Sequence, residues 1–255
     1  MAASNEPGAP RPPAPWRPVR PIWDRPEPTA RRPRFSRDQI AAAALAIADA
    51  DGFEAVTMRR IAGALGAGTM SLYRYIETKD DLLSLIDDAI LGEALVPGEL
   101  PADWRAAIGL LARRSVRAYL NHPWAIQALQ GRAGRRASAG PNSARHFEQS
   151  LAAVARSPLT PRARLDLLAI VDDYVYGHVL RAAELAERAD SGTDLAGAFE
   201  AIQGRLPAAE LPHLAALAAD PAARSLADPG ELDARFERGL RLIVDGAAAG
   251  LLITP

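Results

Sequence analysis

The chain has 255 residues, a formal net charge of −1, 49% hydrophobic and 5% aromatic residues, and no cysteine. The length is enough to bury a core in one large domain or two modest ones, and the lack of cysteine excludes disulfides and thiolate metal sites. No apolar run reaches the length of a membrane span, and the N-terminus lacks the apolar stretch of a secretory signal, so we expect a cytoplasmic protein without membrane contacts.

Residues 1–33 contain ten prolines and few apolar residues, and they show no periodicity. This composition predicts a disordered, partly extended arm. Two interpretations of the arm remain open. It is either an inert solubilising tail, or a segment in which Arg31, Arg32 and Arg34 follow DNA phosphates or the minor groove beside a folded domain.

The first helix is predicted to begin after Ser36. The stretch "SRDQ" is typical of a capping box with Gln39 at the third helical position, and apolar residues then recur at helical spacing. Asp51-Gly52-Phe53 predicts the helix end, because Gly52 can adopt the left-handed conformation there.

Three further helices are predicted before residue 95. The second covers 57–65, Gly66-Ala67-Gly68 breaks it, and a short third helix covers about 69–76. The fourth begins at Thr78, which is the expected cap, with Asp81 at the third helical position. Two short helices joined by a tight glycine turn are typical of a helix-turn-helix.

The third helix has two faces with different expected roles. At 100° per residue, Leu72 and Ile76 point toward the core, whereas Met70, Ser71, Arg74 and Tyr75 point away and Tyr73 lies at the margin. Such an outward set is suited to the major groove, with the first residues of the helix at base edges and the tyrosines at phosphates. The alternative is a small helical subdomain in which both tyrosines are half buried.

Residues 34–94 resemble the DNA-binding domain of the tetracycline-repressor (TetR) family. The match lies in "FSRDQIAAAALAIADADGFEAVTMRRIAGALGAGTMSLYRYIETKDDLL". Ile76 departs from the commonest Phe, and Gly68-Thr69-Met70 departs from the polar or Pro residues of many members, which leaves the operator sequence undetermined. The resemblance implies a helix-turn-helix at about 56–75. It implies DNA contacts by Thr57, Arg59, Thr69, Met70, Ser71, Tyr73, Tyr75 and Lys79.

The remaining chain, residues 95–255, is predicted to form a second helical domain after the boundary at Pro97-Gly98 and Pro101. No stretch alternates as a strand does, so the fold class is all-α. The expected helices cover 104–120, 123–131, 143–156, 161–188, 208–219 and 231–252.

Residues 103–188 are similar to the C-terminal domain of the tetracycline-repressor branch through "NHPWAIQAL", "GPN" and the long helix after "LTPRARLDLL". This resemblance implies a domain that forms the homodimer and binds an effector. The helices 161–188 and 231–252 have apolar faces, and "DGAAAG" permits close helix approach, so they predict a four-helix dimer interface. The alternative is an ordinary intrachain core.

An effector pocket in this half should show polar groups among apolar ones. Asn142 and His146 share one helix face, as do Tyr174 and His178, although a single His is more typical of a capped or surface position. The four histidines have no spacing of a metal site, so we expect neither a metal nor another cofactor. The candidate ligand-binding residues are Trp104, Tyr119, His122, Trp124, Gln127, Asn142, His146, Tyr174 and His178.

No enzymatic motif occurs in the sequence: a nucleophile elbow, a P-loop and a dinucleotide glycine motif are missing. Asp172 and Asp173 diverge by 100° on a helix and do not form a working carboxylate pair. The sequence therefore predicts a ligand-responsive regulator that binds double-stranded DNA, most simply a repressor released from a palindromic operator by a small, largely apolar effector. An activator of the same architecture, or an all-α carrier or enzyme, remains the alternative.

Overall fold

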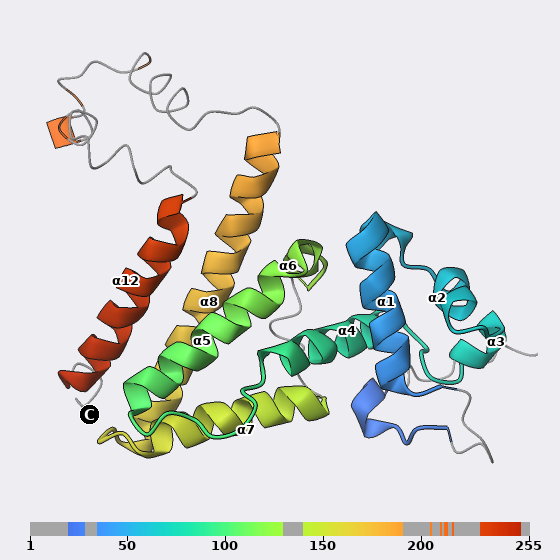
Figure 1. Cartoon of the computed structure of the whole chain (residues 1–255), viewed down its shortest axis with the longest axis horizontal. Helices are drawn as coiled ribbons and strands as arrows, with labels where there is room; N and C mark the ends of the chain where they lie inside the picture. The colour runs from blue at the N-terminus through green and yellow to red at the C-terminus, as the bar shows by residue number, and fades with distance from the viewer. Residues whose placement is uncertain are drawn as a thin grey trace, which may run out of the picture.

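The computed structural model describes residues 20–28, 35–129, 140–190 and 230–250, together with isolated residues between 205 and 216. Within these ranges every regular element is a helix, which confirms the predicted all-α fold (Figure 1). The elements are η1 (Ile22–Asp24), α1 (Arg37–Asp51), η2 (Phe53–Ala55), α2 (Met58–Ala64), α3 (Thr69–Leu72), α4 (Lys79–Ala94), α5 (Trp104–Leu120), α6 (Pro123–Leu129), α7 (Pro141–Ala155), α8 (Pro161–Asp190) and α12 (Gly230–Ala248).

The predicted helix ends near the N-terminus are confirmed. The Ser36 hydroxyl accepts the N–H of Gln39, and the Gln39 side chain accepts the N–H of Ser36, so the capping box is complete. Gly52 has a φ of +82°, which lets the chain leave α1 in the region that side chains with a Cβ avoid. A second capping box, formed by Thr78 and Asp81, begins α4.

Helix α3 is shorter than predicted, since its α-helical part ends at Leu72 rather than at residue 76. Beyond it the N–H groups of Tyr75 and Ile76 both donate to the Leu72 carbonyl, at 2.8 and 3.0 Å, which tightens the chain into a turn. The predicted helix at 208–219 lies almost wholly outside the described residues, as do residues 251–252 of the last predicted helix.

The apolar side chains form two clusters along the molecule. One lies under α1 to α4 and includes Ile40, Ile61 and Ile86, all fully buried. The other lies among α5, α7, α8 and α12 and includes Leu167 and Val179. Figure 1 places α2 and α3 at the end of the molecule opposite α8 and α12, with α4 running between the two parts.

The prediction of a disordered arm at 1–33 is wrong for residues 20–28. Ile22 is 1% exposed and belongs to the cluster under α1 to α4, and Trp23 packs against it. The high proline content predicted disorder, but two apolar side chains, Ile22 and Trp23, anchor the segment to the core. The rest of the predicted arm, with Arg31, Arg32 and Arg34, lies outside the described residues.

Candidate nucleic-acid interface

A tight glycine turn sets the crossing of α2 and α3. Gly66 has a φ of +62°, and the Ala67 N–H donates to the carbonyl of Ala62 at 2.9 Å. Ala62 is 2% exposed, so its small side chain lies at the point where the two helices approach. The geometry is that of a helix-turn-helix.

The inner face of the turn is fully packed, as predicted. Leu72 is 0% exposed and Ile76 is 3% exposed, and both lie in the cluster that contains Ile61. Because Leu72 and Ile76 are buried, the short α3 is held in place by tertiary packing rather than by its own hydrogen bonds.

The outer face of α3 carries side chains that the packing leaves exposed. Met70 is 76% exposed and Tyr73 is 52% exposed, while Thr69 and Ser71 are half-buried at the helix start. A single exposed apolar side chain is common on protein surfaces, so the signal here is that Met70 and Tyr73 are exposed together on the outer face of a helix-turn-helix. The first turn of α3 therefore presents hydroxyl and apolar groups together, which suits base edges and thymine methyl groups.

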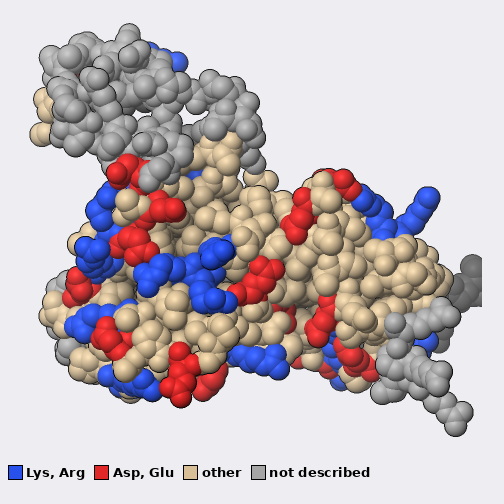
Figure 2. All heavy atoms as spheres, in the orientation of Figure 1, with Lys and Arg blue, Asp and Glu red and all other residues tan. Residues whose placement is uncertain are grey.

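Only a few basic side chains accompany this face. Arg59, Arg74 and Lys79 are exposed, whereas Arg60 pairs with Asp51. On the face shown in Figure 2 the basic side chains gather mainly over the C-terminal half. Residues 35–95 carry five basic and ten acidic side chains, so contact with a polyanion depends on particular positions rather than on a broad positive field. Arg74 was not among the predicted contacts, although its outward direction was predicted.

Tyr75 lies in the core, so its predicted position on the outer face is wrong. The side chain is 6% exposed, and its ring centroid lies 5.0 Å from that of Phe35. The helical count fails here because α3 ends at Leu72 and the following turn rotates Tyr75 into the core. Tyr75 therefore acts as core, while Tyr73 stays on the surface.

The remaining predicted contacts lie at helix starts. Thr57 is the N-cap of α2 and accepts the N–H of Arg60, so its hydroxyl is engaged within the chain. Lys79 is the first residue of α4, and its Nζ lies 5.0 Å from the ring centroid of Phe53. The structure brings Lys79 close to η2 as well as to the exposed face.

An aromatic contact connects Phe53 with the C-terminal half. The rings of Phe53 and Trp124 stack with centroids 5.5 Å apart and planes 7° apart. The Trp124 Nε1–H donates to an Asp49 oxygen at 2.8 Å. Trp124 lies on α6 and Asp49 on α1, so this predicted ligand-binding residue instead lies at the junction between the two parts.

His122 lies at the same junction and bridges two carboxylates. Its Nδ1 is 2.7 Å from Asp49 and its Nε2 is 3.0 Å from Glu93. Burial alone would lower the pKa of His122, but the hydrogen bonds and charges of Asp49 and Glu93 outweigh it, and the pKa is raised. Only the imidazolium form donates to both partners at once. The residue is 7% exposed, so of the two expected positions, capped or surface, His122 has the capped one.

Other candidate ligand-binding residues are engaged between helices. The Tyr119 hydroxyl donates to Asp87 at 3.0 Å, from α5 to α4. The His146 Nε2 lies 3.0 Å from the Ser115 Oγ, between α7 and α5. The Asn142 amide donates to the backbone carbonyl of residue 88 at 3.2 Å. The Tyr119 and Asn142 contacts join α5 and α7 to α4, and the His146 contact joins α7 to α5.

Trp104 and Gln127 occupy opposite environments. Trp104 is 5% exposed inside the C-terminal cluster, whereas Gln127 is exposed on α6. Taken together, the nine candidate residues are distributed over several helix–helix contacts and do not line one cavity among the described residues. Their role in ligand binding stays a prediction.

Tyr174 and His178 do meet, on the face of α8 that packs against α12. The Tyr174 ring stacks on Phe236 with centroids 5.3 Å apart, and the His178 ring lies 4.6 Å from the same ring. Burial lowers the pKa of His178, and its Nε2 is buried without a hydrogen-bond partner among the described residues. The partner residue, Phe236, was not a candidate, because its separation in sequence conceals the contact.

Two negative findings apply to the described residues alone. They contain no group of three or more His, Asp or Glu side chains placed to hold a metal ion. None of their helices combines the length and apolarity needed to cross a bilayer.

Family models match both parts of the chain. The model "Bacterial regulatory proteins, tetR family" matches residues 40–86, and "Tetracyclin repressor-like, C-terminal domain" matches residues 96–251. An "HTH-type transcriptional regulator" from Saccharopolyspora erythraea is 37% identical over 232 residues, which cover 89% of this chain and 91% of that protein. The "HTH-type transcriptional repressor DrrR1" of Streptomyces coeruleorubidus is 37% identical over 163 residues, 61% of this chain and 57% of that one.

Solved structures agree with this assignment. ActR of Streptomyces coelicolor in complex with actinorhodin superposes with a TM-score of 0.68 and 29% identity, over 85% of this chain and 96% of that one. Apo ActR gives a TM-score of 0.65 and 27% identity, over 87% of this chain and 98% of that one. Both parts of the chain therefore match one family in sequence and in fold, and the chain belongs to the tetracycline-repressor (TetR) family of transcriptional regulators, which are not enzymes.

Proposed function

We propose that the protein is a cytoplasmic repressor that binds a palindromic operator as a homodimer and is released by a small, largely apolar effector. The observation that carries the proposal is the exposed first turn of α3, with Met70 and Tyr73 in water above the buried Leu72. A relative that is 37% identical is named a transcriptional repressor, which supports repression over activation. We assign residues 34–94 to DNA binding and residues 95–255 to dimerisation and effector binding.

In this proposal the contacts divide by chemistry. Thr69, Met70 and Ser71 face base edges in the major groove, because the start of a recognition helix enters deepest. Tyr73 and Lys79 contact phosphates, which fix the register without reading sequence. Arg59 contacts a guanine or a phosphate.

Arg74 joins the phosphate-contacting group on account of its exposure. Tyr75 does not, because it is buried. Thr57 stays in the proposed DNA-contacting set and also caps α2 with its hydroxyl.

The homodimer is proposed to form through α8 and α12. Large apolar side chains remain exposed on these helices in the single chain: Leu165 at 50%, Ile170 at 41% and Leu242 at 76%. Pairing the two helices with a second copy would cover apolar surface and hold two α3 helices about 34 Å apart, one turn of DNA.

The effector is proposed to bind the C-terminal half, as the ligand complexes of ActR suggest by similarity. A buried polar atom without a partner favours a ligand that supplies one, and the His178 Nε2 is such an atom. The effect of the ligand on DNA binding is bounded by its differential affinity for the two conformations of the dimer.

The test is binding to DNA upstream of the protein's own gene, measured by footprinting and by titration against salt. We expect a protected palindrome and an affinity that falls steeply with salt, since phosphate contacts release counterions. Tyr73→Phe and Lys79→Ala should weaken binding to all sequences, and Tyr75→Phe is the matched control because that ring is buried. Protection without any palindrome, with a flat salt dependence, would refute the proposal.

Repression is tested separately with a reporter placed behind the protected DNA. Deletion of the gene should raise reporter expression if the protein is a repressor. A fall in expression would instead support the activator of the same architecture.

A further inference from the structure

Residues 20–28, which we call the strap, lie outside both family-model matches, at 40–86 and 96–251. Their contacts are nevertheless extensive. Ile22 is 1% exposed and packs in the same cluster as Phe35 and Ile40, so the strap is anchored in the core of the DNA-binding head. A tail that merely solubilises the chain would not bury an isoleucine completely.

The strap also fixes the start of α1. The Arg37 N–H donates to the Glu27 carboxylate at 3.2 Å, and the Arg37 guanidinium donates to the Arg25 carbonyl at 2.8 Å. The Trp23 ring lies 5.8 Å from that guanidinium. Arg37 is 7% exposed whereas Glu27 is exposed, so the strap covers the Arg37 side chain while its own carboxylate stays at the surface.

Arg25 connects the strap to the first turn of α4. Its guanidinium lies 2.5 Å from Glu77 and 2.5 Å from Asp81. The same Asp81 oxygen accepts the N–H groups of Glu77 and Thr78, the two residues just before the helix. Arg25 therefore pairs with the carboxylate that caps α4, two residues from Lys79.

Trp23 brings the strap to the C-terminal half. A Cβ added at Gly140, just before α7, would lie 2.6 Å from the Trp23 ring, so glycine is what allows this close approach. The α7 start is itself held by Asp88 of α4, which accepts the N–H of Ser143 at 2.8 Å. The strap thus contacts α1, α4 and the beginning of α7.

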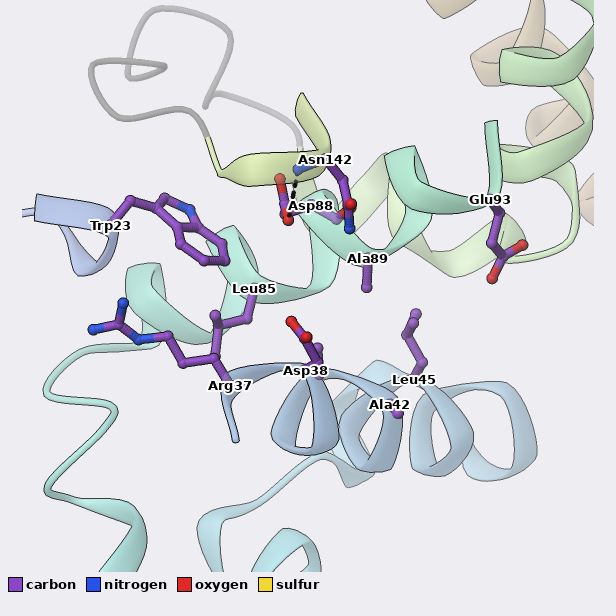
Figure 3. Close-up of a pocket in the computed structure, with 11 residues that line it drawn as sticks. Trp23, Arg37, Asp38, Ala42, Leu45, Leu85, Asp88, Ala89, Glu93 and Asn142 are labelled. Atoms are coloured by element: carbon purple, nitrogen blue, oxygen red, sulfur yellow. Dashed lines mark hydrogen bonds between the residues drawn. The ribbon is translucent and has the colours of Figure 1, made fainter. Parts of the chain in front are cut away.

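A groove lies between α1 and α4 beside the strap. Figure 3 shows Trp23 at one end of a cavity of about 260 Å³, with Asp38 and Leu45 of α1 on one side and Ala89 and Glu93 of α4 on the other. On the side of this cavity, small residues such as Ala42 of α1 and Ala89 of α4 leave a gap between the two helices. At the end of the groove where Trp23 lies, the strap contacts both helices, through Arg37 of α1 and Asp81 of α4.

We propose that the strap positions the DNA-binding head against the C-terminal half, and that Arg25 is its principal positioning residue. Arg25 acts through Asp81 and the start of α4, without touching DNA. Loss of Arg25 loosens the first turns of α4 and α7, and the two heads of the dimer then spend less time at the spacing that the operator requires. The DNA-binding part of this inference rests on the proposed function.

The experiment compares Arg25→Ala with Arg20→Ala in the full chain. Arg20 is exposed and five residues away, so both variants remove one positive charge from the same segment. Hydrogen exchange is measured first, without DNA. We expect faster exchange at residues 77–82 and 140–144 in Arg25→Ala and no change in Arg20→Ala, with Arg25→Lys restoring part of the protection.

Operator affinity is measured next as a function of salt. Arg25→Ala should weaken binding by about 5- to 150-fold, the usual range for coupling between sites, while the slope of log K against log salt stays that of the wild type. A smaller slope would show a lost phosphate contact and overturn the positioning role. Equal hydrogen exchange at these residues in Arg25→Ala and Arg20→Ala would overturn the proposed positioning role of the strap. If the wild type binds no operator, the proposed function fails, and the exchange result still decides the strap.

Discussion

The DNA-binding head and the C-terminal half place their functional side chains in different ways. In the head, the proposed DNA-contacting residues come from one stretch of about twenty residues. Met70 and Tyr73 in this stretch are exposed, while the neighbouring Leu72 is fully buried. In the C-terminal half, candidate polar residues such as His122 and His178 are buried and engaged by other helices. In the head, neighbouring residues therefore divide between packing and the proposed DNA contacts, whereas in the C-terminal half the candidate ligand-binding residues also make packing contacts within the chain.

The largest expected effect tests the C-terminal half. Phe236→Ala removes the ring that stacks on Tyr174 and contacts His178, and should lower the free energy of unfolding by about 3–5 kcal/mol. Phe147→Ala is the matched control, since that ring is 52% exposed on α7. Urea titrations followed by circular dichroism measure both, and an equal loss in the two variants would contradict a core role for Phe236.

The second test separates packing from recognition within the head. Leu72→Ala should lower the free energy of unfolding by about 3 kcal/mol, because removing a fully buried leucine side chain leaves a cavity. Operator binding should also be lost, because Leu72 holds α3 against the core. Met70→Ala, two residues away, should change stability by less than about 0.5 kcal/mol and still alter base preference. The separation of roles is wrong if Met70→Ala unfolds the head or leaves every base preference intact.

The third test compares two threonine caps of the same chemistry. Thr78 caps α4 and Thr160 accepts an N–H at the start of α8, so replacing either with Ala should cost about 1 kcal/mol. Only Thr78→Ala should also weaken operator binding, because α4 begins with Lys79. Melting curves and gel-shift titrations on both variants decide this, and equal DNA affinity would show that the α4 start is not part of the interface.

The smallest expected effects are pH dependences of opposite sign. The raised pKa of His122 means that its contribution to stability is present below about pH 6.5, the unfolded value, and is lost as pH rises through the folded pKa. The lowered pKa of His178 means that its contribution is present above about pH 6.5 and is lost as pH falls toward the folded pKa.

Urea midpoints of the wild type, His122→Gln and His178→Gln across pH 5 to 9 measure these two contributions. The difference between the wild type and His122→Gln should shrink toward high pH, and that for His178→Gln should shrink toward low pH. A change of the same sign in both variants would contradict the assigned environments.

Sequence patterns alone determined the local structure of the chain. The two capping boxes, the end of α1 at Gly52, the glycine turn at Gly66 and the inward Leu72 all depend on residues within about four positions of one another. Such short-range rules hold whatever the rest of the chain does, which is why the helix caps and the glycine turn of the head could be predicted.

Tertiary structure alone decided the remainder. The Asp49–His122 bridge spans 73 residues, the Tyr174 hydroxyl contacts the Phe236 carbonyl 62 residues away, and the strap docks Arg25 on Asp81. Tyr75 turned inward because α3 ended one turn early. The free energy of each contact depends on which helix faces meet, and composition does not reveal that. The composition of the proline-rich segment predicts disorder, yet Ile22 is buried in the cluster under α1 to α4.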